Sequence, residues 1–268
     1  MTEFYYGTPG NDSYNYFGYD NLFAQSYAGD DFIWGNSGDD TIYGGDGADT
    51  LKGFSGDDVI YGDNDNDELY GESGNDTLYG GYGSDVLYGG DGDDYLDGGT
   101  SSAYDTSSDA LYGGAGNDYL LGGSIHDYLF GQEGNDTLSG YSGDDYLYGG
   151  EGSDVIYGGD GHDRIGGFFG TDIQYDTLYG GAGNDTFILG DSYGAFYQGS
   201  LGHATIADWE WQNDYIEVSG YASNYSLDFG NYGVGGYASD TGIYYGNELI
   251  AVVQDNTNVS ISRDFQFV

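Results

Sequence analysis

Residues 44–97 decide the fold, because they repeat one nine-residue pattern six times, as GGDGADTLK, GFSGDDVIY, GDNDNDELY, GESGNDTLY, GGYGSDVLY and GGDGDDYLD. The pattern returns over residues 113–166 and again at 180–188, which makes about 19 units between Gly7 and Ile188. The sixth position of each unit is Asp and the eighth is apolar or aromatic. A fixed period of this kind indicates a repeat architecture, in which each unit buries its apolar side chain against its neighbours.

Each position of the pattern has a structural meaning. The last three residues predict a short strand and the first six a turn. Side chains alternate along a strand, so the eighth residue points inward and the seventh and ninth point outward. A single strand cannot bury its Leu, but two facing rows of strands can, so two units should complete one turn of a flattened coil. The glycines allow positive φ in the turns. We therefore predict an all-β solenoid of parallel strands.

The composition is strongly acidic. The chain has 47 Asp and Glu but 3 Lys and Arg, for a formal net charge of −44, and it has no Cys. Three cations cannot form a basic patch, which excludes nucleic acid and disfavours anionic membrane surfaces. No apolar run of about 18 residues is present, so we expect no membrane span. Aromatic residues make up 18% of the chain, which is more than a disordered chain carries. We expect a protein that folds when its charge is cancelled.

The pattern is the nonapeptide G-G-x-G-x-D-x-U-x, in which U is a large apolar residue. Over roughly residues 7–188 the chain therefore resembles the RTX (repeat-in-toxin, haemolysin-type) family of calcium-binding proteins. The resemblance implies a right-handed parallel β-roll with a β-rich C-terminal cap. It also implies Ca²⁺ ions between turns i and i+2, held by the sixth-position carboxylate and turn carbonyls. With three His and no Cys, oxygen ligands suit calcium rather than zinc or copper.

An array of about 19 units offers at most about 17 sites between turns. We expect fewer ions, because Asp65 and Ile125 replace the fourth Gly and the units at Gly98 and Gly167 are expanded. The predicted metal ligands share the sixth position of their units and are Asp31, Asp40, Asp49, Asp58, Asp67, Asp76, Asp85, Asp94, Asp109, Asp118, Asp127, Asp136, Asp145, Asp154, Asp163, Asp176 and Asp185.

The change of pattern along the chain predicts three segments. Residues 1–25 form an N-terminal cap with irregular first repeats, and residues 26–189 form the calcium-binding β-roll. The nine-residue rhythm stops at Leu189, and residues 190–268 contain alternating runs such as HATIADW and LIAVVQD. These runs predict strands. Such a β-rich cap would cover the open end of the coil, whose unpaired strand edge would otherwise invite aggregation.

The two ends of the sequence bear on export. The N-terminal MTEFYYGTPG lacks a basic segment followed by an apolar one, so no cleavable signal peptide is expected. The last residues, Asp264-Phe265-Gln266-Phe267-Val268, resemble the uncleaved C-terminal signal of type I secretion in RTX proteins. We therefore expect the type I machinery as a partner and an extracellular or cell-surface location. Calcium outside the cell would then fold the chain.

No catalytic pattern is convincing. Residues 190–194 match G-x-S-x-G around Ser192, but this glycine and serine content gives such a match by chance and the strand–turn–helix context is missing. The stretch from Asp63 to Asp67 resembles the start of an EF-hand loop without its Gly and Glu. His126, His162 and His203 are scattered. RTX hydrolases carry a catalytic domain ahead of their repeats, for which the chain leaves no room. We predict that the protein is not an enzyme and has no catalytic residue.

Outward-facing aromatic residues predict a further surface. Alternate units lie on opposite faces, so Tyr70 and Tyr88 should stack on one face and Tyr43, Tyr61 and Tyr79 on the other. Such rows stabilise a sheet by about 0.2–1 kcal/mol per pair. They could also contact a cell surface, a glycan or another copy of the chain.

The sequence thus favours a secreted, non-enzymatic calcium-binding protein with a structural or adhesive role. The alternative is a module that folds and exports a partner or cargo. Ice binding is less favoured because the seventh-position Thr row is interrupted by Val and Tyr. Mineral binding stays open, since bound calcium beside excess carboxylate could meet a crystal face.

Overall fold

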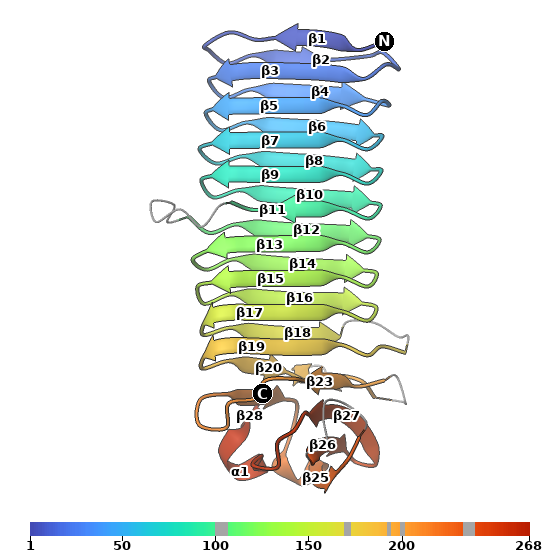
Figure 1. Cartoon of the computed structure of the whole chain (residues 1–268), viewed down its shortest axis with the longest axis vertical. Helices are drawn as coiled ribbons and strands as arrows, with labels where there is room; N and C mark the ends of the chain where they lie inside the picture. The colour runs from blue at the N-terminus through green and yellow to red at the C-terminus, as the bar shows by residue number, and fades with distance from the viewer. Residues whose placement is uncertain (100–106, 169–172, 192–193, 199–201, 233–238) are drawn as a thin grey trace. The chain divides into compact units, whose positions relative to one another are not determined.

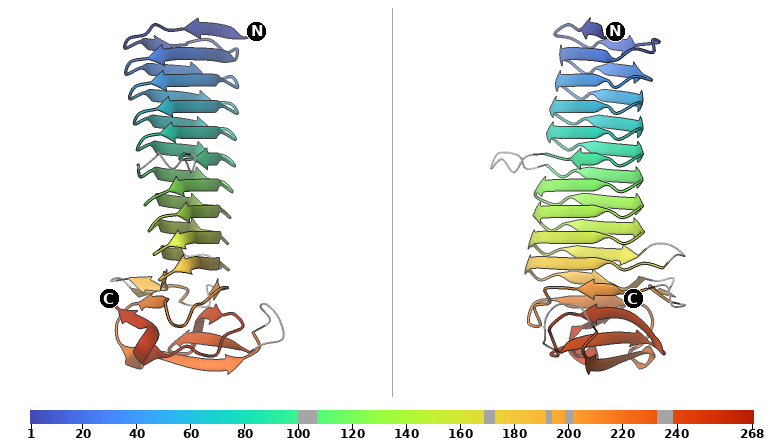
Figure 2. Two further views of the ribbon diagram at one scale, coloured as in Figure 1. Left: turned by 60° about the vertical axis from the view of Figure 1, so that its left-hand side comes forward. Right: turned by 45° about the vertical axis from the view of Figure 1, so that its right-hand side comes forward.

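The structure is a computed structural model that describes residues 1–99, 107–168, 173–191, 194–198, 202–232 and 239–268. The chain forms two compact units, Met1–Glu133 and Gly134–Val268. Each unit consists of short strands in two sheets (Figure 1). Both views of Figure 2 show the strands within each unit stacked in rows. Because the chain alternates between the sheets, strands that are neighbours in one sheet are two repeats apart in sequence.

The first unit contains only parallel pairs among its described strands. One sheet contains β1 (Glu3–Tyr6), β3 (Leu22–Ala28), β5 (Thr41–Asp46), β7 (Val59–Asn64), β9 (Thr77–Tyr82), β11 (Tyr95–Asp97) and β13 (Tyr119–Ser124). The other contains β2 (Ser13–Asn15), β4 (Phe32–Asn36), β6 (Thr50–Ser55), β8 (Glu68–Ser73), β10 (Val86–Asp91), β12 (Ala110–Ala115) and β14 (Tyr128–Glu133).

The second unit begins in the same way and ends in a different arrangement. One sheet contains β15 (Thr137–Ser142), β17 (Val155–Gly161), β19 (Thr177–Gly183), β23 (Ala204–Ile206), β27 (Glu248–Val253), β26 (Asp240–Tyr245) and β25 (Tyr225–Gly230). The other contains β16 (Tyr146–Glu151), β18 (Arg164–Phe168), β20 (Thr186–Ile188), β24 (Tyr215–Val218) and β28 (Phe265–Phe267). The remaining elements are β21 (Gly190–Asp191), β22 (Gly194–Ala195), the 3-10 helix η1 (Ala222–Asn224) and the one-turn helix α1 (Ile261–Asp264).

The eighth position of the repeat forms the core. Residues 18 apart pair across neighbouring strands, as Ile60 does with Leu78 and Leu78 does with Leu96. All three side chains are fully buried. The residues on either side point outward and are partly exposed, as the alternation predicts. The predicted all-β parallel roll is confirmed.

The C-terminal part of the second unit covers the last strands of the coil. Strands β25, β26 and β27 form an antiparallel meander, and β27 pairs in parallel with β23. In the other sheet β28 pairs in parallel with β24. The last repeat strands, β19 and β20, pair with β23 and β24 and are therefore not edge strands.

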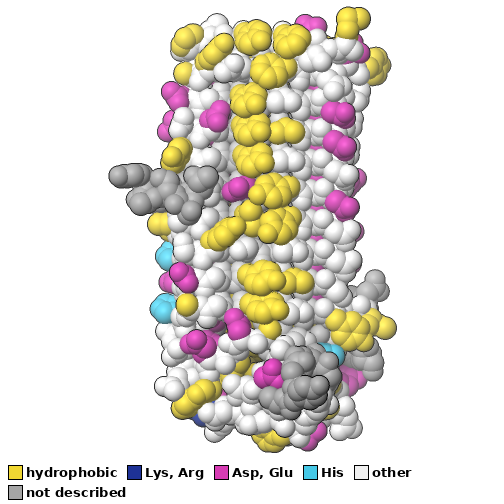
Figure 3. Space-filling model, in the orientation of Figure 1, with side chains coloured by type: hydrophobic (Ala, Val, Ile, Leu, Met, Phe, Trp, Pro, Cys, Tyr) yellow, Lys and Arg dark blue, Asp and Glu magenta, His cyan; other side chains and the backbone are white. Residues whose placement is uncertain are grey.

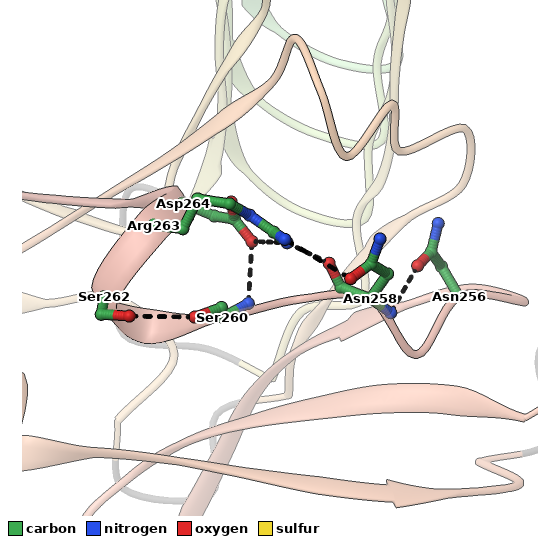
Figure 4. A network of polar contacts seen from close by, with 6 residues as sticks. All are labelled: Asn256, Asn258, Ser260, Ser262, Arg263 and Asp264. Atoms are coloured by element: carbon green, nitrogen blue, oxygen red, sulfur yellow. Dashed lines mark hydrogen bonds and ion pairs between the residues drawn. The ribbon is translucent and has the colours of Figure 1, made fainter.

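The residues predicted as an export signal form β28 and the turn before it. Asp264 is 2% exposed, and its carboxylate accepts hydrogen bonds from the Ser260 N–H and from the Arg263 guanidinium. Arg263 also donates to the Asn258 carbonyl, and the Asn258 N–H donates to the Asn256 side chain (Figure 4). These bonds hold the chain in the short helix that leads into the last strand.

Replacing the core residue Leu78 by Ala should lower the free energy of unfolding by about 2–5 kcal/mol, because a fully buried side chain leaves a cavity. Urea unfolding followed by circular dichroism in calcium measures this loss. The matched control is Thr77→Ala on the outer face of the same strand, which should cost about 0.5 kcal/mol or less. Equal losses from both variants would show that the eighth position is not the core.

Candidate metal-binding turns

The turns between the strands hold all the predicted ligand residues in one kind of environment. Every one of the 17 sixth-position Asp side chains is at most 4% exposed. The residues that lead into the sheet containing β5 or β15 are Asp40, Asp58, Asp76, Asp94, Asp118, Asp136, Asp154 and Asp176. The residues that lead into the sheet containing β4 or β16 are Asp31, Asp49, Asp67, Asp85, Asp109, Asp127, Asp145, Asp163 and Asp185. Within each unit these two sets form two columns, one at each edge of the coil.

Hydrogen bonds join the members of each column. The backbone N–H of one Asp donates to the Oδ1 atom of the Asp one turn later, as from Asp40 to Asp58 at 2.7 Å and from Asp58 to Asp76 at 2.8 Å. The same bond joins Asp49 to Asp67 at the other edge at 2.8 Å. The Asp side chain thus links successive turns, which Glu, with one more methylene, could not do at the same spacing.

The second carboxylate oxygen is left without a hydrogen-bond partner in many turns. The position-one glycine makes room for it, because a Cβ on Gly71 would clash with the Oδ2 atom of Asp76. Among the residues that the structure describes, this unpartnered state is shared by the buried Oδ2 atoms of Asp31, Asp49, Asp58, Asp67, Asp76, Asp94, Asp154, Asp163 and Asp185. A buried carboxylate oxygen without a partner is costly, so each marks a place that a cation would satisfy.

Backbone carbonyls supply the other oxygen atoms of the turns. The fourth-position Gly74 has φ of +132° and packs against the carbonyl of Gly56, so a Cβ at Gly74 would clash with that carbonyl. Among the described residues, no group of three or more His, Cys, Asp or Glu side chains could hold a metal. Carboxylate and carbonyl oxygens therefore fit a hard cation such as Ca²⁺, with carbonyls making up much of the ligand set.

The irregular repeats keep the turn at the expense of backbone strain. Asp65 replaces the fourth Gly and has φ of +75°, which Asp tolerates. Ile125 replaces it elsewhere and has φ of +105°, which is unfavourable for a β-branched residue. The resemblance of the segment from Asp63 to Asp67 to an EF-hand gains no support, since no three carboxylates converge among the described residues.

Sequence reasoning missed the end of one column. At the start of the other column Leu22, rather than an Asp, donates its N–H to Asp40, and the nearby Asp20 is exposed. Asp214 lies beyond the recognised repeats, yet it is 3% exposed and its Oδ1 atom accepts the N–H of Asp185. The run Asp214-Tyr215-Ile216-Glu217 has the D-x-U-x end of a repeat, which is the signal that could have found it.

The other candidates from the sequence are Ser192 and the histidines. Ser192 of the G-x-S-x-G match lies outside the described residues. The ring nitrogen of His162 accepts a hydrogen bond from the Asn184 backbone, which leaves it a structural role. Burial lowers the pKa of His203.

The predicted aromatic rows are present on opposite faces of the first unit. Tyr43, Tyr61 and Tyr79 stack with ring centroids 4.6 and 4.9 Å apart. On the other face Tyr70 and Tyr88 stack at 4.9 Å, and Tyr112 and Phe130 continue the row. Figure 3 shows a column of hydrophobic side chains along one face. The stacked rings cover one another's faces, and the Tyr residues of both rows are half-buried.

The buried carboxyl groups resist ionisation. Burial, with a smaller contribution from neighbouring carboxylates, raises the pKa of Asp58, Asp67 and Asp154 to about 8. Burial likewise raises the pKa of Asp94 to about 7. The N–H donated from the preceding turn opposes these shifts without cancelling them. At neutral pH the columns therefore need either protons or cations.

The comparisons with known proteins agree with this geometry. The model of the RTX calcium-binding nonapeptide repeat (4 copies) matches residues 24–51, 34–69, 43–78, 70–101, 105–129, 121–156, 130–165, 139–173 and 174–192. No curated protein matches the chain. In the part of the chain that the structure describes, no helix has the length and apolar character needed to cross a membrane.

Without metal, the folded protein should be more stable in mild acid than at pH 8. The folded-state pKa values of about 6 to 8 lie above the ordinary value of 3.8, so the folded state binds more protons between these limits. The stability that these protonated carboxyl groups contribute is fully present below about pH 4 and is lost as the pH rises through 6 to 8. Circular dichroism in a chelator at pH 5 and pH 8 measures this.

The same measurement in saturating calcium is the control, and there the difference in stability between pH 5 and pH 8 should largely disappear. A metal-free chain that is equally folded at both pH values would contradict the conclusion that ionising the buried Asp carboxyl groups destabilises the fold.

Proposed function

The chain belongs to the RTX calcium-binding nonapeptide repeat family, and on that premise we propose that it is a multivalent calcium-binding β-roll whose folding is coupled to the ions. The observation that carries the proposal is the set of buried, unpartnered Oδ2 atoms in successive turns. In this proposal the carboxylate ligands come from among the 17 predicted sixth-position Asp residues. The binding segment is residues 26–189, flanked by residues 1–25 and by a C-terminal cap at 190–268.

Electrostatics explains why folding would depend on the ions. Neighbouring carboxylates in a column are about one strand spacing apart, about 4.8 Å. At that distance two unit charges repel by about 3 kcal/mol at an effective dielectric constant of about 20. A folded domain is stable by only about 5–15 kcal/mol, so a few ionised neighbours would offset its stability. Three Lys and Arg residues cannot neutralise 47 acidic ones. Divalent cations in the turns would both remove the repulsion between carboxylates and provide partners for the unpartnered Oδ2 atoms.

We propose further that the protein acts outside the cell. Proteins with these repeats are generally secreted. At low cytosolic calcium the repulsion would keep the chain expanded, and the type I machinery could export it in that state. The final residues from Asp264 would serve as the export signal and then fold as β28. Folding on meeting calcium would make export effectively one-way.

The role we propose is non-enzymatic and structural or adhesive. The stacked Tyr rows support it, because they place aromatic edges and hydroxyl groups at regular intervals of about 5 Å. Such a surface suits contact with a cell surface, a glycan or a second copy of the chain. A folding module for an exported cargo is the alternative, and it would not need the rows to be exposed.

Calcium titration of metal-free protein at pH 7.5 should convert an expanded chain into a compact β-rich one in a cooperative transition. The reason is that each ion removes repulsion between neighbouring turns. Circular dichroism and small-angle scattering measure this, with magnesium as the control ion. A chain already compact in chelator at this pH, with calcium adding little, would contradict coupled folding.

Replacing Tyr43, Tyr61 and Tyr79 together by Ser should reduce binding to glycans or cell surfaces several-fold while leaving calcium-induced folding in place. The control is Thr41→Ser with Thr77→Ser, which changes the same strands without touching the rings. The amount of protein bound to the surface is measured for both variants. Unchanged binding by the Tyr-to-Ser variant would show that this Tyr row has no adhesive role.

A further inference from the structure

Two of the predicted ligand residues, Asp176 and Asp40, accept hydrogen bonds from the protein on both carboxylate oxygens, unlike Asp58 and the other residues whose Oδ2 atoms have no partner. At Asp176 the Oδ1 atom accepts the Asp154 N–H at 2.9 Å, and the Oδ2 atom accepts the hydroxyl of Tyr197. Tyr197 follows 21 residues later and is fully buried. A Cβ on Gly167 would clash with both the carboxylate and the hydroxyl, so Tyr197 occupies the space beside the position-one glycine.

The same arrangement is present at Asp40 in the other unit, with a different donor. Its Oδ1 atom accepts the Leu22 N–H at 2.7 Å. Its Oδ2 atom accepts the Asn36 backbone N–H at 2.8 Å and lies 3.3 Å from the Asn36 side-chain nitrogen. Asp58, one turn further, shows the ordinary state, since its Oδ1 atom accepts one N–H and its Oδ2 atom has no partner.

The neighbouring turns explain why donors are needed at these two places. Strand β19 pairs with β23 so that Thr177 lies opposite Thr205, which puts Ala204 where the next turn would need an Asp. At the other place β3 pairs with β5 so that Phe23 lies opposite Thr41, which puts Leu22 before Asp40. In both cases the residue at the Asp position of the adjoining turn, Leu22 or Ala204, has no carboxylate to share an ion.

We propose that Tyr197 and Asn36 take the place of a calcium ion at these two turns, so that Asp176 and Asp40 are not calcium ligands. The inference rests on the proposed calcium binding and states at which two turns no ion is bound. A donated proton and a cation repel each other at the same oxygen, so a carboxylate already accepting hydrogen bonds on both atoms is a poor site for an ion. The hydroxyl and the amide satisfy a buried oxygen where a second carboxylate ligand is missing.

Isosteric Asp-to-Asn variants test the proposal in matched pairs, Asp176→Asn with Asp154→Asn and Asp40→Asn with Asp58→Asn. Native mass spectrometry counts the calcium ions per full-length chain, and circular dichroism in calcium confirms folding. Asp176→Asn and Asp40→Asn should keep the wild-type number, while Asp154→Asn and Asp58→Asn should each lose at least one ion. Loss of an ion from Asp176→Asn or Asp40→Asn would overturn the proposal.

The experiment also separates the two proposals from each other. If the wild-type chain binds no calcium, the proposed function is refuted. If the wild-type chain binds calcium and all four variants lose ions, only the proposal that Asp176 and Asp40 are not ligands is refuted. If Asp176→Asn does not fold, Tyr197→Phe provides the second test. Removing the hydroxyl frees an oxygen of Asp176, so the number of ions should equal or exceed the wild-type number, and a lower number would count against the assigned role.

Discussion

The rest of the structure depends on one hydrogen bond, from the backbone N–H of an Asp to the carboxylate of the Asp one turn later. The bond fixes the register of the turns, and the fixed register aligns the eighth-position side chains in the core. It also determines the electrostatics, because it holds one buried carboxylate above the next. Stability and the need for counter-ions therefore have the same origin.

The regular part of the fold could be predicted from the sequence because every unit carries the same information. The sixth-position Asp, the eighth-position Leu and the turn glycines each have one role, and repetition removes ambiguity. The ends could not be predicted in the same way. Leu22, Ala204 and Tyr197 acquire their roles from pairing between strands, which a repeat pattern does not encode. Asp214 carried a visible signal, but it stood without the glycines that mark a turn.

The aromatic rows and the carboxylate columns illustrate two effects of stacking identical units. Stacking tyrosines at about 5 Å is favourable, since each ring covers the next. Stacking carboxylates at a similar spacing is unfavourable until their charge is compensated. The protein places the first outside, where the rings need no partner, and the second inside the turns, where backbone oxygens can help to hold a cation.

The two expanded repeats have a consequence for how such a chain can change in length. The N–H of Asp85 reaches the carboxylate of Asp109 across 24 residues, and Asp154 reaches Asp176 across 22, yet the bonds match those across 18 residues. The hydrogen bond between successive turns is therefore kept across the extra residues of both expanded repeats. A repeat can therefore be lengthened while the column of Asp residues continues, so the scaffold can acquire new loops in evolution, or by engineering, while its core sequence stays the same.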